Sequence, residues 1–472
     1  MARPLVLHPD RLFPADETVR AIARRLYAHV ATLPIVSPHG HTDPRWFAEN
    51  AAFTDAAQLL LQPDHYVLRM LYSQGVRLED VGIAPVDGSA SVIADQRSAW
   101  RVFAENYHLF RGTPTRLWLD WVFHELFAID VRLDQETADF YFDRIEQRLA
   151  TPEFRPRALF DRLNIEVLAT TESPLDRLEH HAAIRASGWQ GRVITAFRPD
   201  PVVDPEYEGF LENLAALSAL TGEDCFAYSG YLGALRQRRA AFAAAGATST
   251  DHGHPTAATA DLGDAEAAAL FAVVAAGKAS SAQAELFRAH MLTVMAGMSI
   301  DDGLVMQLHP GSFRNHNSAV FGRFGRDKGA DIPTRTDFVH GLRPLLDRFG
   351  NDPRLTLIVF TLDESTYARE LAPLAGHYPA LRLGPAWWFH DSPEGMRRFR
   401  AQMTETAGFY NCVGFNDDTR AFLSIPARHD VARRIDCGVL ADLVAQHQLD
   451  EDEAAELAVD LSYRLAKQAY RL

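Results

Sequence analysis

The sequence predicts an α/β protein, a (β/α)8 barrel with a large helical insertion after the first strand. Eight short apolar runs recur along the 472 residues, and most of them are followed by a segment with helical spacing of apolar residues. Strands that alternate with helices pair in parallel, because parallel strands need crossover connections. Eight such units indicate a closed barrel. Length alone would allow two or three domains, but such barrels also accept long insertions.

The eight runs predict the strands in chain order. The first, "LPIVSPH", begins at Leu33 and ends at His39. The others are "IEVLATT" (165–171), "RVITAFR" (192–198), "GATSTDHG" (246–253), "DGLVMQLH" (302–309), "LTLIVFTL" (355–362), "LRLGPAWWF" (381–389) and "YNCVGFND" (410–417). A doubly wound open sheet is the structural alternative. No glycine-rich nucleotide fingerprint follows any run to support it.

Helical patterns occupy the segments around these runs. Before the first run, Asp16 precedes "TVRAIARRLYAHVATL", in which apolar residues fall on one helical face. "SPLDRLEHHAAIRAS" follows the second run and "TRTDFVHGLRPLLDRF" follows the fifth. An alanine-rich helical excursion separates the fourth and fifth runs. The C-terminal "DEDEAAELAVDLSYRLAKQAYRL" is a helix with acids first and bases last, as the helix dipole favours.

One connection is much longer than the rest. Residues 45–163 separate the first and second runs and are mostly helical in pattern, as in "DHYVLRMLYSQGV" and "TADFYFDRIEQRLA". A structureless loop of this length would be unusual inside a compact domain. We therefore expect residues 1–44 and 164–472 to form the barrel and residues 45–163 to form a helical insertion over its mouth.

Composition excludes several classes of partner. The net charge of −15, with no evident cluster of Lys and Arg, disfavours nucleic acid. No apolar stretch is long enough to cross a membrane, and the N-terminal "MARPLVLHPDRLFPADE" lacks the features of a secretory signal. Three scattered cysteines are too few for a disulfide framework. We expect a reduced cytoplasmic protein, and barrels with exposed helices often self-associate into homo-oligomers.

Two histidines at the end of the first strand suggest a metal site. His39 and His41 stand two residues apart, so on a strand they would face the same way. A polar turn with two ordinary histidines is the alternative. A second pair, His252 and His254, ends the fourth run, but Gly253 interrupts the strand geometry there. Position favours the first pair, because barrel enzymes keep their chemistry at the carboxyl ends of the strands.

Other strand ends carry polar residues that would meet the same rim. His309 closes the fifth run, Arg198 closes the third, and Asp417, Asp418 and Arg420 end or follow the eighth. A lone histidine or arginine at such a place is usually an ordinary surface or hydrogen-bonding residue. Their convergence is what favours a site. Two imidazoles and a carboxylate suit one divalent metal ion such as Zn²⁺.

These residues resemble the amidohydrolase superfamily, which places His-x-His on the first strand and an aspartate on the eighth. Within it the chain closely resembles the uronate isomerase (glucuronate isomerase) family over nearly its whole length. The matching motifs are "HPDRLFP", "PHGHTDP", "DHYVLRMLYSQGV", "LATTESPLD", "FRPD", "DHG", "QLHPGSFRNHN", "WWF.D" and "DDTRAFLS...RHD". The resemblance implies a cytoplasmic enzyme of carbohydrate metabolism. It would interconvert D-glucuronate with D-fructuronate, and D-galacturonate with D-tagaturonate, moving a proton between C2 and C1 through an enediol(ate).

The resemblance also implies roles for individual residues. His39, His41 and Asp418 would hold the metal, and Asp418 and Tyr66 would transfer protons, with His65 beside Tyr66. Arg420 would stabilise the intermediate, and Arg198 would bind the substrate with it. His309 would contact the substrate or a metal-bound water, and Trp387 and Trp388 would wall the pocket. On sequence alone, Tyr66 reads more simply as a half-buried aromatic, and a tryptophan pair is equally often plain packing.

The sequence departs from the superfamily pattern at several positions, and these bear on the number of metal ions and on the pocket wall. The fourth and sixth runs carry "TSTDHG" and "FTLDES", without the lysine and histidine of two-metal hydrolases, so one ion is expected. The family pattern assigns the acid to Asp418 rather than Asp417. His390 stands where an amide is expected, so that wall is predicted to differ. Two rival functions are a mononuclear hydrolase of an ester, amide or lactone, and a non-catalytic sugar-acid binding protein.

Overall fold

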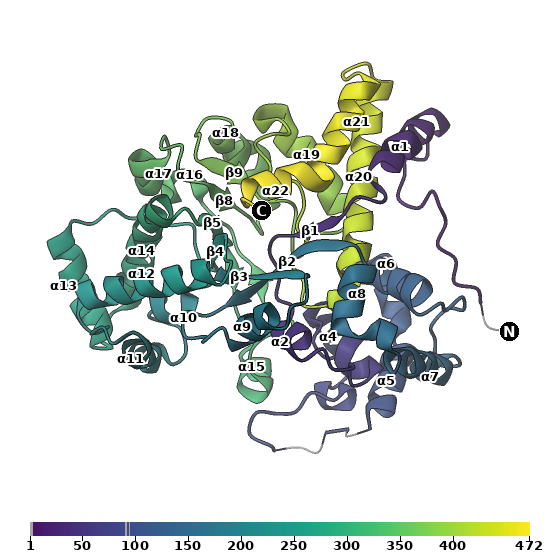
Figure 1. The fold of residues 1–472 in the computed structure, drawn as a ribbon, viewed down its shortest axis with the longest axis horizontal. Coiled ribbons are helices and arrows are strands. Elements are labelled where there is room, and N and C mark those ends of the chain that lie inside the picture. The colour runs from purple at the N-terminus through teal and green to yellow at the C-terminus, as the bar shows by residue number, and fades with distance from the viewer. Residues whose placement is uncertain (1–2, 90–91, 94) are drawn as a thin grey trace.

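Parallel strands form one curled sheet in the computed structural model, which describes residues 3–472 except 90, 91 and 94 (Figure 1). The strand order is β1-β2-β3-β4-β5-β8-β9, so consecutive barrel strands are neighbours. The strands are β1 (Ile35–Ser37), β2 (Ile165–Glu172), β3 (Arg192–Phe197), β4 (Ser249–His252), β5 (Val305–Leu308), β8 (Leu357–Val359) and β9 (Leu381–Leu383). Each lies within one of the predicted runs or overruns it by one residue. The predicted (β/α)8 fold is confirmed.

The eighth predicted strand is reduced to a single parallel bridge. Cys412 pairs with Leu383 of β9, and the Leu383 amide donates to the Asn411 carbonyl at 2.8 Å. Gly414 then turns the chain with φ +76°, where an added Cβ would lie 2.7 Å from a carbonyl of the C-terminal segment. The His41 amide donates to the Thr419 carbonyl at 3.0 Å. The start and end of the barrel are thus linked by a hydrogen bond between loops.

Helices fill the connections, as the alternating pattern predicted. Those of the predicted insertion are α2 (Pro44–Glu49), α3 (Ala56–Leu60), α4 (His65–Ser73), α5 (Gln96–Glu105), α6 (Pro114–Trp121), α7 (Ala138–Leu149) and α8 (Pro156–Arg162). Those following β2 to β5 are α9 (Glu179–Ala186), α10 (Asp200–Val203), α11 (Phe210–Thr221), α12 (Tyr228–Ala244), α13 (Asp264–Ala275), α14 (Ser281–Asp302), α15 (Ser318–Phe324), α16 (Phe338–Gly341) and α17 (Arg343–Phe349). The remaining ones are α18 (Ala372–Ala375), α19 (Pro393–Ala407), α20 (Ile425–Ala445), α21 (Glu451–Val459) and α22 (Leu465–Ala469).

The helices between β1 and β2 share an aromatic core of their own. Phe103, Tyr107, Phe123 and Tyr141 are fully buried in it, and it continues onto the barrel through residues such as Leu168 of β2. These helices gather on one side of the strands, away from α11–α14 (Figure 1). Residues 90, 91 and 94 of the predicted insertion lie outside the described residues. The insertion is therefore mostly helical, as the sequence indicated.

The two ends of the chain pack against the barrel. The predicted N-terminal helix is α1 (Glu17–Val30), whose first turn is capped by Asp16 accepting from the Val19 amide at 2.9 Å. It packs against α20 and α21. The predicted C-terminal helix is α21 and α22 joined by one π-helical turn, Asp460–Arg464. Beyond it, Tyr470 is fully buried among Val305, Ile358 and other apolar residues of the barrel interior.

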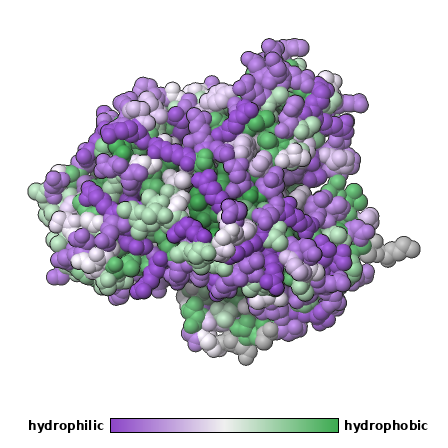
Figure 2. Space-filling model, in the orientation of Figure 1, coloured by the Kyte–Doolittle hydropathy of each residue, from purple (hydrophilic) through white to green (hydrophobic). Residues whose placement is uncertain are grey.

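Polar groups dominate the visible surface. Figure 2 shows a largely hydrophilic face on which hydrophobic residues are interspersed. Among the described residues, no helix has both the length and the apolar character needed to span a bilayer.

The sequence did not predict a hairpin that follows β5. Its strands are β6 (Ser312–Phe313) and β7 (Ile332–Pro333), which pair antiparallel. Between them lie α15 and the segment 325–331, which we call the rim loop. Arg326, Asp327, Gly329 and Asp331 of this loop line the main cavity. The rim loop also meets the insertion, since Gly329 packs against Arg69 and His65.

Replacing Gly329 by alanine is expected to lower the free energy of unfolding. Gly329 has φ +78°, and an added Cβ would lie 2.6 Å from Arg69 Cβ and 2.7 Å from the His65 carbonyl. The left-handed backbone alone costs a non-glycine residue about 1–2 kcal/mol. Urea or thermal unfolding would measure the loss. Gly322→Ala in α15 is the control, because its added Cβ meets nothing within 4 Å. Equal stability of the two variants would contradict this prediction.

Candidate active site

A cavity of about 1000 Å³ opens at the carboxyl ends of the barrel strands. Its wall contains residues of the first five predicted runs and of the seventh, residues that directly follow the eighth, and residues of the insertion and of the rim loop. The lining includes His39, His41, Arg198, Asp251, His309, Asp418 and Arg420 from the barrel, and His65 and Tyr66 from α4. The predicted site residues are therefore brought together at the rim that the fold class indicated.

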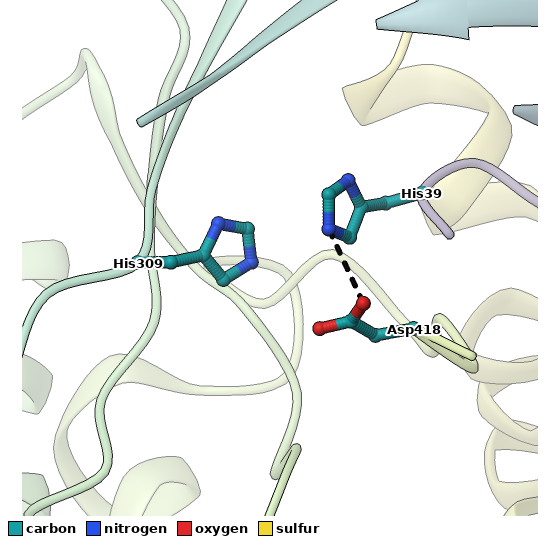
Figure 3. A group of neighbouring side chains, drawn as sticks. All are labelled: His39, His309 and Asp418. Atoms are coloured by element: carbon teal, nitrogen blue, oxygen red, sulfur yellow. Dashed lines mark ion pairs between the residues drawn. The ribbon is translucent and has the colours of Figure 1, made fainter. Parts of the chain in front are cut away.

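His39, His309 and Asp418 converge within this cavity (Figure 3). Each offers one ligand atom, and these atoms all lie within 4.8 Å of one another. His39 Nε2 is 3.4 Å from Asp418 Oδ1, and the imidazoles of His39 and His309 stack with ring centroids 4.8 Å apart. Within the part of the chain that the structure describes, this is the one group of three or more histidines, cysteines and acids close enough to hold a metal ion.

His41 is outside this group of three but contacts the same carboxylate. Its Nε2 lies 3.2 Å from Asp418 Oδ1, so one oxygen contacts both histidines of the His-x-His pair. Burial opposes ionisation of Asp418, yet the neighbouring imidazoles of His39 and His41 hold its pKa well below the ordinary value. The carboxylate is therefore ionised and offers lone pairs to the cluster.

The backbone separates Asp418 from its neighbour Asp417. Asp418 has φ +36°, in the left-handed region that residues other than glycine rarely adopt. Asp417 points elsewhere, and its Oδ2 accepts from His429 Nε2 of α20 at 3.0 Å. The two adjacent acids thus contact different groups, Asp418 in the cavity and Asp417 on α20. The family pattern assigns the acid of the site to Asp418, and Asp418 is the one of the two that lies beside His39 and His41.

Two charged residues, Asp251 and Arg198, orient the imidazole of His309 from its Nδ1 side. His309 Nδ1 donates to Asp251 Oδ1 at 2.7 Å, which leaves its Nε2 buried and without a hydrogen-bond partner among the described residues. Asp251 Oδ2 lies 3.0 Å from Arg198 Nη1. Although burial alone would raise the pKa of Asp251, Arg198 and His309 hold that pKa well below the ordinary value. This arrangement fixes the His309 tautomer and directs Nε2 toward His39 and Asp418.

The two predicted arginines occupy different surroundings. Arg198 is held by Asp251 and also donates from Nε to Asp200 Oδ2 at 2.9 Å. Arg420 lies at the edge of the cavity, where its Nη2 is 3.1 Å from Asp327 Oδ2 of the rim loop. Arg198 is thus a fixed positive charge, whereas Arg420 has a single acidic partner that an anionic ligand could replace.

The insertion supplies His65 and Tyr66 through the start of α4. The helix begins after Asp64, whose side chain accepts from the Tyr66 amide at 2.8 Å. Burial lowers the pKa of His65 to about 3, so its imidazole is neutral, and its Nε2 is buried without a hydrogen-bond partner among the described residues. Tyr66 is 8% exposed, and its hydroxyl donates to Asp391 Oδ2 at 2.8 Å.

The predicted aromatic wall is present, but His390 is not part of it. Trp387 and Trp388 both line the cavity, and Trp387 packs against His309 with ring centroids 4.6 Å apart. His390 is absent from the lining, and its Nε2 donates to the Leu362 carbonyl at 3.0 Å. Of the second histidine pair, His252 is fully buried beside Thr250, 3.1 Å from its hydroxyl. His252 and His254 lie outside the ligand group.

Four residues of the site had no predicted role, namely Asp251, Arg314, Asp391 and Arg428. Asp251 supports His309, Arg314 lies over the Trp388 ring, and Asp391 and Arg428 meet Tyr66. Each stands in a motif that carried the family resemblance, namely "DHG", "QLHPGSFRNHN", "WWF.D" and "RHD". Those motifs were the signal that could have identified them.

Tyr470, near the end of the sequence, is connected to the site through Gln307. Tyr470 donates from its hydroxyl to Gln307 Oε1 at 2.8 Å. Gln307 Nε2 in turn lies 3.5 Å from His39 Nδ1. The C-terminus therefore supports the imidazole of the first predicted ligand through one intervening amide.

The fold and this site define a class, the barrel enzymes that work at the carboxyl ends of their strands with histidine and carboxylate groups able to hold a metal ion. Comparison with known proteins gives the family. The glucuronate isomerase family matches residues 17–470. The uronate isomerase of Rhizorhabdus wittichii is 78% identical over 472 residues, which is 100% of both chains. This chain belongs to the glucuronate isomerase family.

Solved structures agree with this assignment. The glucuronate isomerase from Caulobacter crescentus superimposes with a TM-score of 0.98 at 63% identity, covering 99% of this chain and 98% of that one. The uronate isomerase from Thermotoga maritima gives a TM-score of 0.91 at 28% identity, covering 98% and 99%. The fold is thus shared at both high and low sequence identity.

Proposed function

We propose that this protein interconverts D-glucuronate with D-fructuronate, and D-galacturonate with D-tagaturonate, by moving a proton between C2 and C1. The observation that carries the proposal is the ionised Asp418 held beside His39 and His41 in a cavity that also contains Arg198 and Arg420. A proton transfer next to a carbonyl needs a base at the carbon and positive charge near the oxygens. The membership of the glucuronate isomerase family agrees with this chemistry.

One divalent metal ion, with zinc preferred, would be held by His39, His41 and Asp418. The donor set suits it, since nitrogen and carboxylate ligands are those that zinc accepts. The buried and unpartnered Nε2 of His309 is directed at the same point, which makes His309 a further candidate ligand in addition to its predicted contact with substrate or water. When bound, the ion would polarise substrate oxygens and stabilise negative charge on them.

Each side chain of the site has its own role in the proposed reaction. Asp418 takes the proton from C2 and returns it to C1, and Tyr66 exchanges a proton with a substrate oxygen. Arg420 stabilises the enediol(ate), and Arg198 adds fixed positive charge for an acidic substrate. His65 lies against Tyr66 and Trp388, and together with Trp387 these rings exclude water from one side of the cavity.

The chain divides, in this proposal, into a barrel of residues 1–44 and 164–472 and an insertion of residues 45–163 over the mouth. The positions of His65 and Tyr66 in the cavity lining support this division. We assign the protein to the cytoplasm, because Cys225, Cys412 and Cys437 are all free and buried. We also propose that the protein forms a homo-oligomer and binds neither nucleic acid nor membranes.

The test is to purify the protein, measure its metal content, and offer D-glucuronate and D-galacturonate separately. Ketose formation without change of mass, with about one metal ion per chain, is the expected result. Absence of ketose, together with uptake of one water by a uronate ester, amide or lactone, would instead indicate a hydrolase, and tight binding without turnover would indicate a sugar-acid binding protein. Either of these outcomes would overturn the isomerase proposal.

Replacing Asp327 by asparagine is expected to lower the KM for D-glucuronate. The substitution frees Arg420 from its acidic partner, which an anionic substrate must otherwise displace. Partly exposed ion pairs contribute about 0.2–1 kcal/mol, so a decrease of up to about fivefold is expected with kcat unchanged. Steady-state kinetics would measure it.

Glu208→Gln is the matched control for general electrostatics. Glu208 also lines the cavity and also pairs with an arginine of the rim loop, Arg326, at 3.6 Å, but it does not contact Arg420. Its KM should stay close to that of the wild type. A higher KM or a lower kcat for Asp327→Asn would show that Asp327 positions Arg420 for catalysis.

A further inference from the structure

The Tyr66 hydroxyl is bonded to a buried carboxylate that the reaction scheme above does not use. Tyr66 donates its hydrogen to Asp391 Oδ2 at 2.8 Å. An ionised carboxylate only accepts hydrogen bonds, so the hydroxyl hydrogen is committed to Asp391. What Tyr66 presents to the cavity is therefore the lone pairs of its oxygen. In this state Tyr66 accepts a proton from a substrate hydroxyl more readily than it donates one.

Arg428 of α20 holds Asp391 in place. Its Nη1 donates to the same Oδ2 at 3.2 Å, and its guanidinium lies 3.6 Å from the centre of the Trp118 ring. Asp391 and Arg428 are 6% and 4% exposed. The second oxygen of Asp391, Oδ1, is buried and has no hydrogen-bond partner among the described residues. Asp391 is thus fixed behind Tyr66, with unused capacity to bind a proton.

The protonation properties of this pair agree with its geometry. Burial raises the pKa of Asp391 above the ordinary aspartate value, although Arg428 opposes the rise. Burial and the adjacent Asp391 also raise the pKa of Tyr66 well above its usual value. A tyrosinate is therefore unfavourable here, and Tyr66 can take up one proton only while it releases another.

Interconversion of an aldose and a ketose moves two hydrogens. One passes from C2 to C1, which is the transfer given above to Asp418. The other passes from the hydroxyl at O2 to the oxygen at O1. We propose that Tyr66 and Asp391 form a proton relay for this second hydrogen, with Asp391 as the group that holds it between the two oxygens. The relay rests on the isomerase function proposed above.

The step balances without any further reactant. The O2–H bond of the substrate breaks as a new O–H bond forms at Tyr66, and the original Tyr66 proton passes to Asp391 Oδ2. The carbonyl then forms at C2. The relay runs in reverse to form the O1–H bond, which returns Asp391 to the carboxylate and Tyr66 to its starting bond. The same sequence read backwards serves the ketose.

Asp391→Asn tests the relay in the full-length, metal-loaded protein. The amide oxygen still accepts the Tyr66 hydrogen bond but cannot take up the proton. The expected result is a decrease in kcat of about 100-fold with little change in KM, the usual range for loss of one proton-transfer group. Exchange of the C2 hydrogen of D-glucuronate with deuterated water should persist, because Asp418 is intact.

Two further variants are compared with Asp391→Asn, one as a control and one as a second test of the relay. Asp436→Asn is the matched control, since Asp436 is 5% exposed and accepts from the buried Arg400 at 2.7 Å, away from the cavity. Its kcat should remain that of the wild type. Tyr66→Phe should give the same separation of turnover from exchange. Combining it with Asp391→Asn should cause no additional loss, because the two groups act as one unit.

Retention of wild-type kcat by Asp391→Asn would overturn the relay. A parallel loss of kcat and C2 exchange would overturn it as well, because it would show that Asp391 only holds the site together. Should Asp391→Asn fail to fold, Tyr66→Phe decides by the same two measurements. A wild-type protein that leaves hexuronates unchanged would overturn the proposed function itself, which is a separate result.

Discussion

Replacing Asp418 by asparagine is expected to reduce isomerisation about 1000-fold, within the range that a positioned general base contributes. The substitution keeps the shape of the side chain but removes the charge that lies beside His39 and His41. Exchange of the C2 hydrogen with labelled water should be lost together with turnover. Proton NMR in deuterated water would follow both reactions in one sample.

The neighbouring acid provides a matched control. Asp417 is also buried and also bonded to a histidine, His429, but it points away from the cavity cluster. Asp417→Asn should retain C2 exchange. Metal content measured on both variants would separate loss of the base from loss of a ligand. Wild-type exchange in Asp418→Asn would remove Asp418 from the mechanism.

Replacing His39 by alanine is expected to lower the affinity for the metal ion more than about 100-fold, because even outer partners of metal ligands contribute 10- to 100-fold. His39 is 1% exposed and belongs to the one ligand group found among the described residues. Metal analysis after dialysis, with isomerase activity measured in parallel, would show both losses. Activity should return only at a large excess of added metal.

The second histidine pair offers the control for this experiment. His252→Ala removes an equally buried imidazole from the end of β4, where no ligand group forms among the described residues. The metal content of this variant should stay near that of the wild type. Equal metal loss in both variants would contradict the assignment of His39 as a ligand.

The barrel was predictable because its signals are local. Short apolar runs alternating with amphipathic segments are dictated by burial on both faces of a parallel sheet, and each strand of the parallel sheet lies at its predicted position. Strand lengths were less predictable. The run 381–389 yields only Leu381–Leu383, and directly after it Gly384 packs so closely on the Phe360 ring that an added Cβ would lie 2.3 Å from it. Such tertiary contacts leave no periodic trace in the sequence.

The site residues were likewise predictable only in part. His39, His41, Asp418 and His309 stand at strand ends, so topology alone placed them on one rim. Asp391 and Arg428 lie on a loop and on α20, and only the folded chain shows that Asp391 accepts from the Tyr66 hydroxyl and that Arg428 donates to Asp391. The roles of buried partners of this kind depend on three-dimensional contacts between segments far apart in the chain. Sequence reasoning reached them only as unexplained members of family motifs.

The contact from Tyr470 through Gln307 to His39 has a consequence for biosynthesis. Because translation proceeds from the N-terminus, the imidazole of His39 lacks this support until Tyr470 has left the ribosome. A chain that stops before Tyr470 carries His39 without this support, and we expect its imidazole to be less well oriented.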